Sequence, residues 1–99
     1  MQSALKDFSI VKRIPEQVSC NLSGEAVILN MNSGMYYGID EIGAFIWGVL
    51  EEPRTLEYLR ETILSTYQVD RETCNSDVMA FLADMNAAGL IEIDDLPTA

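Results

Sequence analysis

Three consecutive stretches decide the fold: Glu25-Ala-Val-Ile-Leu-Asn-Met31, Asn32-Ser-Gly34 and Met35-Tyr-Tyr37. The first stretch is short and rich in apolar residues, and the third begins a new run with two aromatic residues. The residues between them are typical of turns, because glycine takes positive φ at no steric cost and asparagine tolerates it. Two such runs joined by a three-residue loop that contains glycine predict a β-hairpin.

The apolar period changes directly after this hairpin and predicts a helix over about residues 41–52, ended by Pro53. Asp40 stands just before it and can accept hydrogen bonds from the first free N–H groups of a helix. Gly43 and Gly48 lie inside it, and each costs ~1 kcal/mol relative to Ala. We therefore expect both glycines to allow close approach of a neighbouring element. The apolar face of this helix consists of Ile42, Phe45, Ile46, Val49 and Leu50.

The chain before the hairpin predicts one more strand. Residues 17–22 alternate in polarity and join residues 25–31 and 35–39 in a three-stranded antiparallel meander. Residues 1–16 are expected to form an extended arm or an edge strand, because Pro15 would interrupt a central ladder.

Two further helices are predicted after Pro53. Thr55 is expected to cap the first of them, which runs to about Tyr67. The next begins near residues 72–76 and has Gly89 as its C-terminal cap. Residues 90–93 are expected to add a short strand or to pack on the helices. The alternatives for the N-terminal cap of the last helix are Thr73, Asn75 and Ser76.

Three strands followed by three helices predict an α+β fold, in which a small antiparallel sheet packs against a three-helix bundle. The length of 99 residues corresponds to one domain with a modest core. We assign that domain to residues 17–93, with the arm at 1–16 before it and an acidic tail at 94–99 after it.

The charge balance argues against two classes of partner. The chain carries 16 acidic and 6 basic residues, for a net charge of -10. Nucleic-acid binders need a concentrated basic surface, and anionic membranes repel an acidic protein. No apolar run approaches the roughly 18 residues of a membrane span, and no signal peptide is evident. We expect a soluble, cytoplasmic protein that binds neither nucleic acid nor membrane.

Catalytic and metal chemistry find little support in the residue types. The chain has no histidine, which removes the usual general base and the commonest metal ligand. Cys20 and Cys74 are far apart in the sequence and are expected to be free thiols. No motif of a nucleophilic enzyme or phosphate-binding loop is present. We therefore expect no catalytic residue, metal or cofactor, and we consider binding instead.

An exposed strand edge is the feature best suited to binding. Met35-Tyr36-Tyr37 carries no charge that would protect such an edge from pairing with another chain. If this strand is an edge beside the last helix, the two define a groove that Val78, Phe81 and Met85 could line. The alternative for each of these three side chains is that it fills the core.

Five segments together resemble the PqqD-like family, also called recognition elements of ribosomally synthesised and post-translationally modified peptides (RiPPs). They are Ala26-Val-Ile-Leu-Asn30, Ser33-Gly-Met-Tyr-Tyr-Gly-Ile-Asp40, Gly43-Ala-Phe-Ile-Trp47, Asp77-Val-Met-Ala-Phe-Leu82 and Ala88-Gly-Leu-Ile91. The resemblance covers about residues 18–93. It implies a winged-helix-like module that does not catalyse, but binds the leader segment of a precursor peptide and presents it to a modifying enzyme.

In that family the leader adds as an antiparallel strand beside the third strand and rests against the third helix. The resemblance places Met35, Tyr36, Tyr37 and Gly38 on the pairing edge. It assigns Asp77 a contact to a basic or polar leader residue. Which of Tyr36 and Tyr37 faces the groove depends on the strand register and stays open. The helix wall would consist of Val78, Phe81, Leu82 and Met85.

The family leaves more than one pathway open. We favour lasso-peptide biosynthesis, in which the partner is a leader protease, and the alternative is a peptide chaperone for a radical SAM enzyme of the pyrroloquinoline quinone (PQQ) type. A winged-helix DNA-binding regulator is the second class of function, and the net charge argues against it. A small enzyme is the third, and no group of residues supports it.

Overall fold

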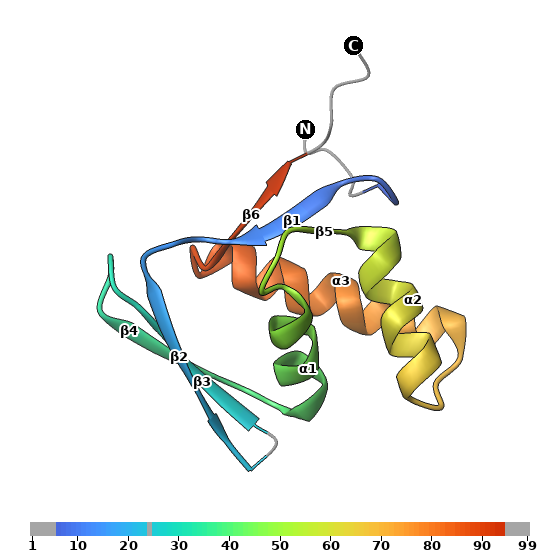
Figure 1. The fold of residues 1–99 in the computed structure, drawn as a ribbon, viewed down its shortest axis with the longest axis horizontal. Helices are drawn as coiled ribbons and strands as arrows, with labels where there is room; N and C mark the ends of the chain where they lie inside the picture. Colours follow the sequence, from blue (N-terminus) through green and yellow to red (C-terminus); the bar gives the residue numbers. More distant parts are fainter. Residues whose placement is uncertain (1–5, 24, 95–99) are drawn as a thin grey trace.

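The computed structural model describes residues 6–23 and 25–94, and it has three helices and two small sheets over these residues (Figure 1). Residues 1–5 of the predicted arm and 95–99 of the predicted tail lie outside the described residues. The elements are β1 (Ile10–Arg13), β2 (Gln17–Leu22), β3 (Glu25–Asn30), β4 (Met35–Ile39), α1 (Glu41–Val49), β5 (Arg54–Thr55), α2 (Leu56–Thr66), α3 (Arg71–Ala87) and β6 (Ile91–Asp94).

The predicted meander is confirmed as an antiparallel sheet in the order β2–β3–β4. Its turn between β3 and β4 contains Gly34 at φ +75, the conformation for which glycine is suited. Directly opposite residues share one face of a sheet. Ser19, Ile28 and Tyr37 form one such row on the inner face, and Tyr36 lies on the outer face opposite Leu29.

The second sheet has the order β5–β1–β6, which corrects the prediction for residues 10–13. This segment is the middle strand of a sheet rather than an arm or an edge strand. Its partners are residues 54–55 on one side and 91–94 on the other. Pro15 does not interrupt the ladder, because β1 ends before it. Residues 90–93 were expected to form a strand or to pack on the helices, and β6 is that strand.

Two of the predicted helix caps are confirmed. The Asp40 carboxylate accepts a hydrogen bond from the Gly43 N–H at 2.9 Å, at the start of α1. The Thr55 hydroxyl accepts one from the Tyr58 N–H at 3.1 Å, at the start of α2. Helix α1 ends at Val49, three residues earlier than predicted.

The start of α3 differs from the prediction. Asp70 occupies the N-cap position and its side chain makes no capping bond, so the cap predicted at Thr73, Asn75 or Ser76 is wrong. Those three residues lie within the first turns of a helix that begins at Arg71. The C-terminal cap is confirmed, because Gly89 follows the helix at φ +72.

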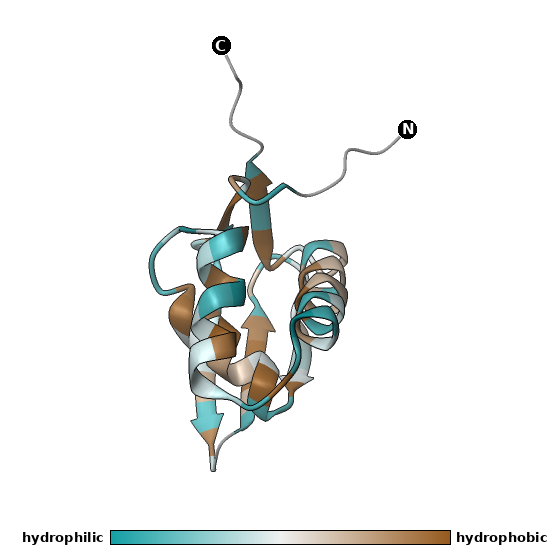
Figure 2. Ribbon diagram, turned by 90° about the vertical axis from the view of Figure 1, so that its right-hand side faces the viewer, coloured by the Kyte–Doolittle hydropathy of each residue, from teal (hydrophilic) through white to brown (hydrophobic). Residues whose placement is uncertain are grey.

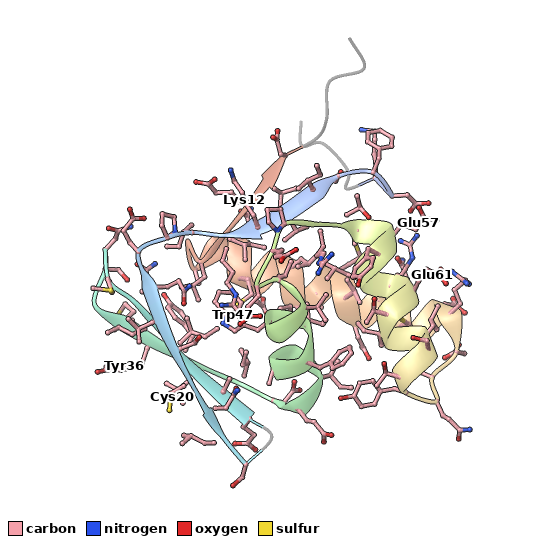
Figure 3. All side chains as sticks on the ribbon, in the orientation of Figure 1. Lys12, Cys20, Tyr36, Trp47, Glu57 and Glu61 are labelled. Carbon is pink, nitrogen blue, oxygen red and sulfur yellow. The ribbon has the colours of Figure 1, made fainter. Side chains whose placement is uncertain are left out.

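The core lies between the sheets and the helices. Figure 2 shows both apolar and polar bands along the helices and strands, as expected where each element buries one side. In Figure 3 the side chain of Trp47 projects from α1 on the side of the β2–β3–β4 sheet, and the Arg13 guanidinium lies 4.4 Å from its ring centroid. The buried apolar residues include Val11, Ile28, Ile46, Leu50, Leu56, Leu59, Val78, Leu82 and Leu90.

Candidate functional site

The open edge of the meander faces α3 across a groove of about 540 Å³. Strand β4 is an edge because β3 is its only partner in the sheet as described. The lining comes from β4 and the residue after it, and from the second half of α3. It consists of Tyr36, Tyr37, Gly38, Ile39, Asp40, Phe81, Asp84, Met85 and Ala87.

A smaller hollow of about 290 Å³ adjoins this groove at the start of α1. The two share Asp40, Phe81 and Asp84, so Phe81 stands at the boundary between them. The smaller hollow adds Asp77 from α3 and Gly43 from α1. We refer to the groove and the adjoining hollow together as the channel.

The two tyrosines of β4 point to opposite faces of the sheet. Tyr37 lies on the inner face and packs partly buried against the core. Tyr36 is 69% exposed and projects on the side of the sheet away from α1, as Figure 3 shows. The register therefore directs the Tyr37 side chain toward the helices and leaves Tyr36 at the outer rim of the groove.

Most of the residues expected at the site are brought together by the structure, but they do not share one environment. Tyr36, Tyr37, Gly38, Phe81 and Met85 line the groove. Asp77 lies in the adjoining hollow, and Met35 is exposed at the start of β4 outside both linings.

Val78 and Leu82 belong to the core in the structure. Both are 0% exposed, and neither lines the groove. They lie one helical turn apart and continue a buried stripe with Cys74 and Met85. Asp77, Phe81 and Asp84 form the neighbouring stripe at i, i+4 and i+7, which faces the channel.

Helical spacing would have found one further lining residue. Asp84 lies three residues after Phe81 and seven after Asp77, so it shares their face. Asp40 and Gly43 carried no comparable signal. Their place in the channel depends on how α1 packs beside α3.

The channel is acidic and contains apolar side chains, and no described Lys or Arg lines it. Asp40, Asp77 and Asp84 are all exposed. No group of three or more metal-ligating side chains occurs within residues 6–23 and 25–94. Of the helices in that part of the chain, none is long and apolar enough to span a membrane. The arrangement offers an unpaired strand edge, an aromatic ring and carboxylates, which suits an extended ligand.

The family described as Coenzyme PQQ synthesis protein D (PqqD) matches residues 25–91 of this chain. The chain belongs to the PqqD family. The match runs from the start of β3 to the start of β6, so it contains both walls of the groove. The resemblance seen in the sequence is thereby confirmed.

Two solved structures are similar to this chain. One is described as "TbiB1 in Complex with the TbiA(beta) Leader Peptide" and is 34% identical, with a TM-score of 0.76, covering 82% of this chain and 94% of that one. The other is described as "Lasso peptide synthetase B1 complexed with the leader peptide" and is 22% identical, with a TM-score of 0.71. It covers 88% of this chain and 98% of that one, and at this identity it supports the fold alone. No curated protein matches the chain significantly.

Proposed function

We propose that this protein is a non-catalytic adaptor that binds the leader segment of a ribosomally made precursor peptide. The observation that carries this proposal is the uncharged edge strand β4 beside a groove lined by Tyr37, Phe81 and Met85. A structure 34% identical to this chain was determined with a leader peptide, which supports the same kind of ligand here.

The leader would add to β4 as a fourth antiparallel strand. Backbone hydrogen bonds along Met35–Ile39 would hold it, and alternate side chains would enter the groove toward Phe81. Asp84 and Asp77 would favour a basic or polar leader residue at that end. We also propose that the fold is winged-helix-like, that the protein has no catalytic activity and that it is located in the cytoplasm.

The bound leader would be presented to a modifying enzyme, and we favour a leader protease of lasso-peptide biosynthesis. The solved structure described as a lasso peptide synthetase B1 shares the fold, which is compatible with this choice. The family description names PQQ synthesis instead, so a chaperone for a radical SAM enzyme is the alternative. Titration with leaders of both kinds separates the two pathways.

The experiment is a fluorescence-polarisation titration of the protein with leader peptides encoded beside its gene. We expect saturable binding in the micromolar to nanomolar range, about -8 to -12 kcal/mol. Phe81→Ala is expected to raise Kd by about 30-fold, which is ~2 kcal/mol, because Phe81 lines both parts of the channel.

Phe8→Ala is the matched control, because Phe8 is 44% exposed and lies in neither lining. Its Kd should equal that of the wild type. Circular dichroism establishes that both variants are folded, and hydrogen exchange should show protection of the β4 amides when the leader is bound. Failure of the wild type to bind any neighbouring leader would overturn the proposed function.

A further inference from the structure

The two walls of the groove belong to different layers of the molecule. The distance between the walls therefore depends on contacts that join these layers. One wall is the edge strand β4 and the other is α3, and the groove lies open between them. Two contacts tie the walls together or to a common support. One lies near the start of β4, and the other lies near its end.

The first contact is made by the side chain of Asn30, a polar residue that is only 4% exposed. Its amide nitrogen donates to the Ala88 carbonyl at 2.9 Å and lies 3.5 Å from the Gly89 carbonyl. Its amide oxygen accepts from the Asn32 N–H at 2.9 Å and from the Ser33 N–H at 3.3 Å. One side chain thus joins the β3–β4 turn to the C-terminal end of α3.

The position of Asn30 in the sheet makes this contact relevant to the groove. Asn30 pairs with Met35, the first residue of β4, across the antiparallel ladder. Ala87, which lines the groove, precedes the carbonyl to which Asn30 donates. The bond therefore fixes the start of one wall against the end of the other.

The second contact is the approach of Phe81 to Gly43. A Cβ atom at position 43 would lie 2.8 Å from Cε1 and 3.2 Å from Cδ1 of the Phe81 ring. The edge of the Phe81 ring, on α3, therefore packs against the backbone of α1 at Gly43. Gly43 lies just after Asp40, the N-cap residue that follows β4. A Cβ atom at position 48, the other glycine of this helix, would meet no atom from the rest of the protein within 4 Å. Close approach, which the sequence predicted for both glycines, is confirmed at Gly43 and wrong at Gly48.

We propose that Asn30 and Gly43 are positioning residues that set the separation of β4 and α3 at the two ends of the peptide groove. This inference rests on the proposed function, and it assigns a role to residues that act through Ala88 and Phe81. An added strand must keep hydrogen-bonding distance to β4 while its side chains pack on α3. A change in the separation of the walls therefore weakens one set of contacts or the other.

The test measures leader affinity in Asn30→Ser and Gly43→Ala. A serine hydroxyl can still accept from the N–H two residues on, but it is too short to reach α3, so the turn keeps its cap while the tie is lost. The Cβ of alanine at position 43 would overlap the Phe81 ring, so the ring must shift. We expect each substitution to raise Kd by about tenfold or more, as loss of one well-made buried contact would.

Each variant has a matched control elsewhere in the same element type. Asn21→Ser changes an exposed asparagine of β2, and Gly48→Ala changes the glycine of α1 that has free space around it. Both controls should bind the leader with wild-type affinity. Ile63→Val, on the buried face of α2, lowers stability without touching the groove, and it too should bind normally.

A distance measurement separates this inference from the proposed function. Spin labels at the exposed positions Tyr36 and Ala83, in a Cys20→Ser background, report the spacing of β4 and α3 by pulsed electron paramagnetic resonance. Asn30→Ser should broaden or lengthen the distribution, and Asn21→Ser should not. An unchanged distribution in Asn30→Ser, or wild-type affinity in both test variants, would overturn the inference. A changed distribution in Asn30→Ser, together with an unlabelled wild type that binds no leader, would support the positioning role and reject the adaptor function.

Discussion

Cys20 and Cys74 are free thiols, as predicted, and they lie in opposite environments. Cys20 is exposed on β2, whereas Cys74 is 2% exposed in the first turn of α3 and its sulfur lies 3.7 Å from the Arg60 carbonyl oxygen. Burial raises the pKa of the Cys74 thiol above its ordinary value of 9.0, and the nearby guanidinium of Arg60 opposes that shift only in part.

A thiol reagent is therefore expected to modify Cys20 rapidly in the folded protein and Cys74 only on unfolding.

The raised pKa of Cys74 also links stability to pH, because the folded state favours the protonated thiol. This contribution is complete below the ordinary pKa of 9.0 and declines as pH rises through the higher folded value. The free energy of unfolding, measured in urea below and above that pH, should fall more steeply with rising pH in the wild type than in Cys74→Ala. An equal dependence on pH in the two proteins would contradict the raised pKa of Cys74.

At the scale of elements, α1 and α3 both have an aspartate at the N-cap position, but only one of the two side chains makes a capping hydrogen bond. Asp40 accepts a hydrogen bond from the Gly43 N–H at the start of α1, and Asp70 makes no side-chain bond at the start of α3. Asp40→Ala should therefore lower the free energy of unfolding by ~1 kcal/mol. Asp70→Ala should change it by less than about 0.5 kcal/mol. Urea denaturation measures both, and similar losses would show that the capping bond is not the cause.

Local patterns predicted the elements that depend on local contacts. The hairpin, the meander and α1 follow from turn residues, alternation and a capping aspartate within residues 17–49. Strand β5 escaped prediction because it has two residues and is defined by its pairing with β1. The middle position of β1 was missed for the same reason, since its partners are distant in the sequence.

The candidate site was predictable to the same extent. Tyr37, Phe81 and Met85 line the groove as expected from an edge strand beside a helix. Val78 was assigned to the same wall, but it faces the core, because apolar residues at i and i+3 or i+4 do not reveal which side of an amphipathic helix is covered. Asn30 gave no such signal either, since its bond to Ala88 joins residues 58 positions apart.

At the scale of the whole molecule, the net charge of -10 acts on every contact. The exposed ion pairs Lys12–Glu92 and Arg71–Glu61 contribute little, because solvent screens them. Repulsion among the remaining acids should dominate, so the free energy of unfolding should rise with sodium chloride up to about 0.2 M. Urea is the suitable denaturant because it adds no ions. A fall in stability with salt would show instead that the ion pairs outweigh the repulsion.

The central place of β1 has a consequence for biosynthesis. A ribosome releases residues 10–13 early, but the strand needs residues 54–55 and 91–94 on its two sides. The β2–β3–β4 meander, in contrast, is complete once residue 39 has emerged. Vectorial folding should therefore form the β4 edge first and close the other sheet only after translation has passed residue 94. Of all the strands in the described part of the chain, β1 is synthesised first, and its partner strands are the last to be completed.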